Sequence, residues 1–263
     1  MKIVLTIAGS DPFGGAGMQA DIKTMTSHGV YAMSAVTLIS AQNSMGFYGV
    51  QETKPEFLEK QIDYLFQDIN PDATKTGMLL SKELIEMTAK KIKEYKPKNL
   101  IIDPVIVAQK KIQLINDDAI ETLLTELIPL ADLITPNKEE TEIIADMKIY
   151  NEKDMEIAAK KIYEKYGCNV LTKSGVEGDN ANDFLYTKEG GHWLYGEKIE
   201  TKNIRGTGDA LSSAIASNLA KGYSLIEACE AAKRYVTAAL KSNIQIGQGR
   251  GPIDNSFDIK GEY

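Results

Sequence analysis

Short runs of aliphatic and β-branched residues alternate with longer stretches of helical periodicity along this 263-residue chain. Such alternation is typical of βαβ units and of a mostly parallel sheet. Several short runs are almost wholly apolar, as expected where helices cover both faces of a sheet. The pattern predicts strands at Ile3–Ala8, Tyr31–Ile39, Ala73–Thr76, Leu100–Ile102, Leu133–Thr135 and Asn169–Thr172.

Helical periodicity fills the intervals between these strands. It predicts helices at Ala16–Ser27, Pro55–Ile69, Lys82–Tyr95, Asp117–Ile128 and Lys153–Tyr166. Asp183–Thr187 and Gly191–Glu200 then have the pattern of a hairpin, and two further helices close the chain. Ser224 and Glu227 form a capping-box pattern at the start of the second of these. Because no linker, repeat or low-complexity tract divides the chain, we expect residues 1–263 to form one domain.

Composition narrows the class of partner. A net charge of −7 argues against nucleic acid and anionic membranes as partners, because both need a basic surface. The apolar runs are too short for a membrane span and Met1–Ala8 has the pattern of a strand, so we expect a soluble cytoplasmic protein. His28 and His192 are too few for a histidine-rich metal site, and His28 is expected to end a helix. Cys168 and Cys229 lack metal-like spacing and are expected to be packed thiols.

Polar and glycine residues follow each predicted strand. Ligands of open parallel sheets usually bind beyond the carboxyl ends of the strands, so these residues suggest one composite site. The alternative is that each loop is an independent turn. The segments are Ala8–Gly17, Gln42-Asn43, Gly77-Met78, Asp103-Pro104, Thr135–Glu140 and Lys173-Ser174-Gly175.

Asn203–Ala210 places two glycines and a carboxylate at the predicted start of a helix. Gly206 and Gly208 permit a tight turn, so the unpaired N–H groups of the first helical turn can converge on a phosphate. Asp209 can then take a proton from a substrate hydroxyl. The alternative is that Asp209 only stabilises the helix start, an effect of about 0.3–1 kcal/mol.

Gly15–Ala20 also matches the dinucleotide-binding pattern G-x-G-x-x-A, which raises the alternative of an NAD-dependent oxidoreductase. That fold needs its glycines directly at the strand end, whereas Gly9–Gly15 separates them here. The second predicted strand ends in Ser40–Asn43, with no acidic residue for a ribose hydroxyl. The glycine-rich loop is therefore better suited to enclosing a small substrate.

A series of motifs runs nearly from end to end of the chain: Ala8–Asp11, Gly14–Asp21, Gly29–Ser34, Ala41–Ser44, Lys75–Leu79, Asp103–Val105, Thr135–Asn137, Gly206–Asp209 and Gly249–Pro252. In this order and spacing the motifs resemble the hydroxymethylpyrimidine/phosphomethylpyrimidine kinases of thiamin biosynthesis, within the ribokinase-like superfamily. The resemblance implies a ribokinase-like three-layer α/β sandwich, with helices on both faces of a mostly parallel sheet. It also implies ATP and Mg²⁺ as cofactors and a homodimer.

The resemblance further implies site residues. Asp209 matches the catalytic base, and the amides of Gly206, Thr207 and Gly208 match the anion hole. Asp103, Asn137 and Glu140 match positions near magnesium and the phosphates; Asp103 and Glu140 are the implied metal ligands, partly through water, and Lys173 lies near the nucleotide. The positions that match the pyrimidine pocket or its lining are Gly9, Asp21, Gln42, Met78 and Val105.

Without the resemblance, simpler interpretations remain open for three of these residues. Glu140 would belong to a solvated helix face beside Glu139 and Glu142, Lys173 would be a surface lysine, and Met78 a core methionine. A Gln amide both donates and accepts, which suits the ring nitrogen and exocyclic amine of an aminopyrimidine.

The chain departs from the family pattern at two places. Asp209 stands where many members have Cys and Arg205 where they have His, and Gly247–Pro252 lacks frequent histidines. The implied activity is ATP-dependent phosphorylation of the hydroxymethyl group of 4-amino-5-hydroxymethyl-2-methylpyrimidine and then of its monophosphate. The alternatives are a pyridoxal or pyridoxine kinase and a noncatalytic nucleotide or vitamin sensor.

Overall fold

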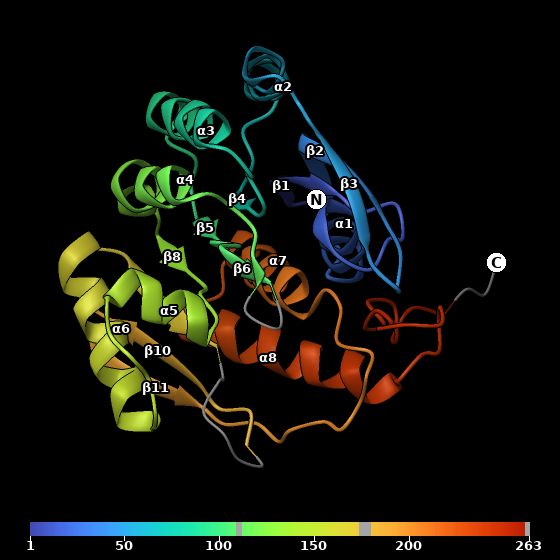
Figure 1. The fold of residues 1–263 in the computed structure, drawn as a ribbon, viewed down its shortest axis with the longest axis vertical. Coiled ribbons are helices and arrows are strands. Elements are labelled where there is room, and N and C mark those ends of the chain that lie inside the picture. Colours follow the sequence, from blue (N-terminus) through green and yellow to red (C-terminus); the bar gives the residue numbers. More distant parts are fainter. Residues whose placement is uncertain (109–111, 174–179, 261–263) are drawn as a thin grey trace.

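A nine-stranded sheet forms the middle layer of the computed structural model, which describes residues 1–108, 112–173 and 180–260 (Figure 1). The strand order in this described part is β11-β10-β9-β8-β5-β4-β1-β2-β3. The strands from β9 to β2 in this order pair in parallel, whereas β3, β10 and β11 pair antiparallel at the edges. The bounds are β1 (Ile3–Ser10), β2 (Tyr31–Gln42), β3 (Phe47–Glu52), β4 (Ala73–Thr76), β5 (Leu100–Ile102), β8 (Leu133–Ile134), β9 (Asn169–Thr172), β10 (Asp183–Thr187) and β11 (Gly190–Leu194).

Helices cover both faces of the sheet, and each layer encloses its own apolar core (Figure 1). The helices on one face are α2 (Pro55–Asp68), α3 (Lys82–Tyr95), α4 (Asp117–Thr122), α5 (Lys138–Ala145) and α6 (Glu152–Tyr166). The helices on the other face are α1 (Gly17–Ser27), α7 (Thr207–Ala220) and α8 (Leu225–Ser242). The three-layer architecture predicted from the sequence is confirmed.

All six predicted strands and the hairpin are present, and three strands have their predicted bounds. The second hairpin strand ends at Leu194, where we predicted Glu200. The first half of the predicted helix Asp117–Ile128 is α4. The chain continues from α4 as a π-helical stretch, Leu123–Leu127, and then as a short 3-10 helix, Ile128–Leu130, which contains Pro129. Proline cannot donate the backbone hydrogen bond that would continue the helix.

Four elements are additions to the predicted list. The edge strand β3 is exposed along almost its whole length, so no apolar alternation marks it in the sequence. Helix α5 begins with the charged run Lys138–Glu140, which hides its amphipathic pattern. Strands β6 (Val107–Ala108) and β7 (Ile112–Gln113) form a two-stranded ribbon that is too short to give a periodic signal.

Residue-level expectations outside the site also hold. His28 is the C-cap of α1, and Ser224 and Glu227 form both bonds of the capping box of α8. Cys168 and Cys229 are buried free thiols, and burial raises the pKa of Cys168 to about 12. No helix in the described part of the chain is both long and apolar enough to cross a membrane.

Candidate active site

Helix α7 begins against the carboxyl ends of the central strands, where it packs on β1, β4 and β5. Its N-cap is Gly206, which has a φ of 83°. A Cβ at this position would collide with the carbonyl oxygen of Gly15, so the close approach of the two loops requires glycine. Two loops that are distant in sequence therefore meet at the start of α7.

The first turn of α7 has no side-chain cap. The N–H of Thr207 reaches the Ile204 carbonyl at 3.4 Å and that of Ala210 reaches the Gly206 carbonyl at 2.9 Å. Across the described residues, the N–H groups of Gly208 and Asp209 have no acceptor. Two backbone donors at a helix N-terminus are thus available to an anion.

The carboxylate of Asp209 lies at this corner and is 19% exposed, so it is accessible rather than sealed inside the protein. Its Oδ1 lies 3.4 Å from Nζ of Lys75, a fully buried lysine on β4. No role for Lys75 was predicted. Its available signal was a charged residue inside an otherwise uncharged strand, all of whose residues are buried.

Asp21, predicted in the pocket or its lining, has a fully buried side chain and lies beneath the site. Its Oδ1 accepts from Lys75 Nζ at 2.7 Å and from Ser213 Oγ at 2.7 Å, and its Oδ2 accepts from Thr6 Oγ1 at 2.6 Å. Burial raises the pKa of Asp21 to about 6, although the Lys75 ammonium opposes this rise. Burial acts against the charge of Lys75, but the carboxylates of Asp21 and Asp209 outweigh it and raise its pKa.

Asp103 and Lys173 reach the same corner from the ends of β5 and β9. Nζ of Lys173 lies 3.1 Å from Oδ1 of Asp103, which also accepts from Thr135 Oγ1 at 3.3 Å. A Cβ built on Gly208 would lie 3.3 Å from Lys173 Nζ and 3.4 Å from Asp103 Oδ2. Burial opposes the ammonium of Lys173, but Asp103 and Glu140 raise its pKa. Ser174 and Gly175, which we predicted at the same edge, lie outside the described residues.

The side chain of Glu140 is buried, so the simpler interpretation that it belongs to a solvated helix face is wrong. Asn137 and Glu140 form a capping box: the Glu140 N–H donates to Asn137 Oδ1 at 2.9 Å and the Asn137 N–H to Glu140 Oε2 at 2.9 Å. Oε1 of Glu140 accepts from the N–H groups of Ile106 at 3.0 Å and Val107 at 3.4 Å. Burial raises the pKa of Glu140, and Lys173 opposes this rise.

These contacts decide which carboxylate can hold a magnesium ion. Glu140 uses both oxygens on backbone amides, which leaves it poorly suited to direct coordination. Asp103 keeps Oδ2 free of any hydrogen-bond donor among the described residues, and that oxygen faces Gly208. Over the same residues, no three His, Cys, Asp or Glu side chains gather as a metal site. The residues present fit an ion that takes one protein carboxylate and completes its shell with phosphate and water.

Val105, another predicted pocket residue, has a φ of 47°. This left-handed conformation is strained for a β-branched residue and costs about 1–3 kcal/mol. The two following amides, of Ile106 and Val107, are those held by Glu140. The capping box of α5 thus holds the loop after β5 in the conformation that presents Val105.

The substrate side of the corner contains the remaining predicted residues. Gln42, at the end of β2, donates through Nε2 to Ser40 Oγ at 2.8 Å and accepts from the Arg205 guanidinium through Oε1. Arg205 also pairs with Asp11 of the glycine-rich loop, with Nε 3.2 Å from Oδ2. The contact between Arg205 and Gln42 fixes the orientation of the amide that we predicted to recognise a pyrimidine.

Gly9 and Met78 lie at the ends of β1 and β4. A Cβ on Gly9 would lie 2.8 Å from the Leu38 side chain, so glycine is needed for packing there. Met78 is half-buried rather than in the core, and its carbonyl accepts from Thr37 Oγ1 at 2.7 Å.

The C-terminal segment touches both loops of this region. The N–H groups of Gly249 and Arg250 donate to Ser44 Oγ at 3.1 Å and to its carbonyl oxygen at 3.0 Å. The backbone of Arg205 pairs with Gly251 and Ile253. The segment Gly247–Pro252 therefore joins the β2–β3 turn to the loop that carries Arg205, as the adjacent tail and β2–β3 hairpin in Figure 1 illustrate.

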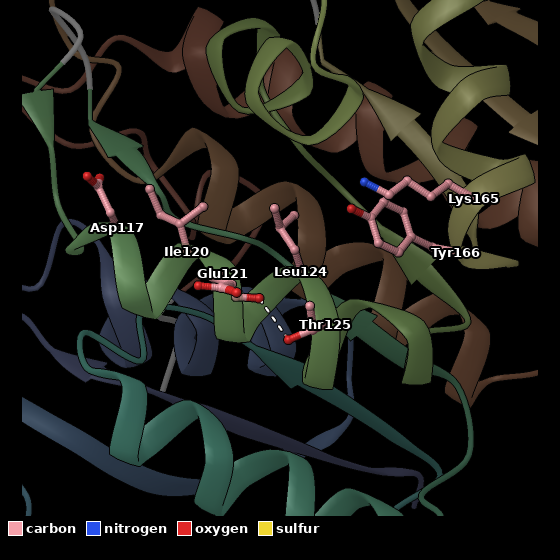
Figure 2. A pocket seen from close by; sticks show the side chains of 7 residues that line it. All are labelled: Asp117, Ile120, Glu121, Leu124, Thr125, Lys165 and Tyr166. Carbon is pink, nitrogen blue, oxygen red and sulfur yellow. Dashed lines mark hydrogen bonds between the residues drawn. The ribbon is translucent and has the colours of Figure 1, made fainter.

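A separate groove lies between α4 and the end of α6 and shares no residue with this corner (Figure 2). Lys165 and Tyr166 line it on one side, and the aliphatic side chains of Ile120 and Leu124 lie on the other beside polar residues of the same helical stretch. It has no paired acid and base, so it is not a candidate for the chemistry.

Comparison with known proteins agrees with the geometry. A family model described as phosphomethylpyrimidine kinase matches residues 11–254. The chain is 40% identical over 258 residues to the hydroxymethylpyrimidine/phosphomethylpyrimidine kinase of Bacillus subtilis, covering 97% of this chain and 95% of that one. It is 42% identical over 254 residues to the thiamine biosynthesis bifunctional protein ThiED of Geobacter sulfurreducens, covering 96% of this chain but 52% of that protein.

A solved structure adds a second activity to the comparison. The ADP complex of Bacillus subtilis pyridoxal kinase superposes with a TM-score of 0.91 and 38% sequence identity, covering 97% of this chain and 98% of that one. The extent of the family match and the identity to curated kinases together assign the fold and the class of reaction, phosphoryl transfer. This chain belongs to the phosphomethylpyrimidine kinase family.

Proposed function

We propose that this protein transfers the γ-phosphoryl group of ATP to the hydroxymethyl group of 4-amino-5-hydroxymethyl-2-methylpyrimidine. The observation that carries the proposal is the juxtaposition of Asp209 with the amides of Gly208 and Asp209, which find no acceptor within the part of the chain that the structure describes. A carboxylate beside free backbone donors is the arrangement that phosphoryl transfer to an alcohol needs.

In the proposed reaction, the substrate oxygen attacks the γ-phosphorus while its proton passes to Asp209. The bond between the γ-phosphorus and the β,γ-bridging oxygen breaks, and ADP leaves. The amides of Gly208 and Asp209 donate to the phosphoryl oxygens, and Lys173 adds positive charge beside them. Because phosphoryl transfer needs little covalent participation by the protein, alignment and electrostatics supply most of the acceleration.

Magnesium belongs to this proposal. Asp103 would hold the ion through its free oxygen, and Mg²⁺ would neutralise charge on the nucleotide phosphates. Glu140 contributes indirectly, by holding the loop that carries Val105 and through its effect on Lys173. This role differs from the direct or water-mediated contact that the sequence resemblance implied.

Substrate recognition is assigned to Gln42, Val105 and Met78, with Gly9 shaping the loop beside them. Arg205 fixes the Oε1 of Gln42, so the amide presents a defined donor and acceptor to an aminopyrimidine edge. We extend the proposal to the monophosphate as a second substrate, because the Bacillus subtilis relative is named a kinase of both the alcohol and its phosphate. A homodimer, suggested by family resemblance, stays a prediction.

The second candidate is a pyridoxal kinase, favoured by the structural likeness to the Bacillus subtilis enzyme of that name. Specificity constants for the aminopyrimidine alcohol and for pyridoxal, measured with ATP and Mg²⁺ in the same assay, decide between them. We expect the larger value for the aminopyrimidine. A larger value for pyridoxal would replace the proposed substrate, and tight nucleotide binding without alcohol-dependent ADP formation would assign a sensor.

The second phosphorylation has its own test. Phosphorus NMR of a mixture of protein, ATP and the pyrimidine monophosphate should show the diphosphate resonances. Absence of diphosphate under conditions in which the alcohol is phosphorylated would limit the activity to the first step.

A further inference from the structure

Lys75 is a fully buried lysine in the centre of the sheet, between the two cores. A buried ammonium is costly unless it is paired and hydrogen-bonded, and replacing such a pair by apolar residues is often neutral or stabilising. Stability alone therefore does not explain an ion pair at this place. The proposed reaction, as described above, also leaves Lys75 without a role.

Four elements meet at Lys75 and determine where its ammonium lies. Asp21 of α1 holds it at 2.7 Å, and Asp21 is itself fixed by Thr6 of β1 and Ser213 of α7. A Cβ on Gly77 would lie 3.2 Å from Nζ, so the glycine that follows β4 leaves room for the ammonium. The second carboxylate that Nζ reaches is that of Asp209, at 3.4 Å.

We propose that Lys75 is a positioning residue that orients the carboxylate of Asp209 and places a positive charge beside it, with Asp21 anchoring Lys75 from below. The inference rests on the proposed role of Asp209 as the base. Lys75 would not touch substrate; it would act through Asp209. The glycine-rich corner supplies the donors for phosphate, and the buried pair beneath it supplies the counter-charge for the base.

The electrostatic consequence has a definite sign. A cation close to a carboxylate stabilises its ionised form, so removing Lys75 removes that stabilisation from the carboxylate it contacts. The other charged groups around Asp209 are Asp21 from α1, Asp103 after β5 and Lys173 after β9. Loss of Lys75 alone would leave two acids and one lysine around Asp209, whereas loss of Lys75 together with the charge of Asp21 leaves Asp103 and Lys173, which have opposite signs.

The decisive variant is the double substitution Lys75→Met with Asp21→Asn. It removes both charges of the buried pair together, which avoids leaving either charge unpaired in the core. We expect ADP affinity to be retained, because neither side chain reaches the amides of Gly208 and Asp209. The acid limb of the single-turnover rate should move to higher pH, by less than the roughly one to three units expected for loss of a close opposite charge alone, because the negative charge of Asp21 is lost as well.

Asp21→Asn alone provides the matched comparison, since it removes one acid but keeps Lys75 beside Asp209. Its acid limb should stay at the position of the unmodified protein or move to lower pH. Lys91→Met is the control for loss of a buried lysine: Lys91 of α3 is 4% exposed and pairs with Asp63 at 2.5 Å, away from the site. That variant should lose stability and keep its pH profile.

Several results would overturn the proposal. One is a folded double variant that binds ADP and keeps the pH profile of the unmodified protein. If the double variant does not fold, an upward shift in Asp21→Asn alone contradicts the role of Lys75, and an unchanged or lowered limb supports it. Asp209→Asn separates this failure from failure of the base assignment, because normal turnover in that variant removes Asp209 itself.

Discussion

Helices α5 and α7 both begin at the carboxyl edge of the sheet, and each has an acidic residue at the same position of its first turn. In α5, Asn137 is the N-cap, and the side chains of Asn137 and Glu140 accept from the N–H groups of Glu140 and Asn137. In α7, the N-cap is Gly206, which has no side chain to offer, so Asp209 and the amides beside it remain available. One residue type at the N-cap decides whether the turn is closed by the protein or left open for a ligand.

The difference also separates two uses of a carboxylate. Glu140 is buried, and both of its carboxylate oxygens accept from backbone amides, so it supports the loop beside the site. Asp209 is partly exposed and contacts Lys75 on one side, as its proposed exchange of a proton with a bound alcohol requires. Negative charge in a first helical turn is therefore not evidence of catalysis unless the turn is open.

The strongest test of the comparison is Asp209→Asn. The amide keeps the shape of the side chain but cannot accept the hydroxyl proton, so turnover should fall by about 10² to 10⁴-fold. Nucleotide affinity, measured by calorimetry with ADP, should survive because the backbone donors are unchanged. Turnover close to that of the unmodified protein would remove Asp209 from the role of base.

Gly206→Ala tests the open turn itself. The added Cβ collides with the Gly15 carbonyl and displaces the start of α7, so turnover should fall by about 10² to 10³-fold, as for loss of preorganised donors. Gly29→Ala is the control, since Gly29 also has positive φ, 71°, but nothing lies within 4 Å of the added carbon. If both variants keep full turnover, the geometry of the α7 corner does not matter for catalysis.

Glu140→Gln tests the closed turn. Loss of the charged acceptor weakens its bonds to three backbone amides, so the free energy of unfolding should fall by about 1–3 kcal/mol in a denaturant titration. The matching control is Glu227→Gln, in the exposed capping box of α8, which should cost less than about 1 kcal/mol. Equal losses at the two capping boxes would show that burial of Glu140 adds nothing.

His28 lies away from the starts of α5 and α7, and its substitution is the one from which we expect the smallest effect on stability. Burial lowers its pKa below 6.5, so the unfolded chain binds its proton more readily than the folded one. Stability should therefore fall as the pH drops below about 6.5, and His28→Gln should weaken this dependence. Chemical denaturation at several pH values measures it; an unchanged dependence in the variant would assign the acid sensitivity to other groups.

Much of the fold follows from local pattern, because buried strands and amphipathic helices leave periodic signals in the sequence. The convergence of Asp103, Lys173 and the Gly206–Asp209 turn also follows, since the ends of parallel strands share one edge of the sheet. The pair of Asp21 and Lys75 does not follow, because periodicity does not say which side chains meet beneath that edge. Contact between Arg205 and Gln42 is likewise tertiary, and β3 lacks the buried face that produces alternation.

The most direct measurement of the central claim is amide hydrogen exchange by NMR, with and without a nonhydrolysable ATP analogue. The amides of Gly208 and Asp209 should exchange rapidly in the free protein and become protected when the nucleotide binds. The amides of Asn137 and Glu140 should be protected in both states, because the capping box already satisfies them. Amides of α7 that stay unprotected at saturating nucleotide would contradict the account.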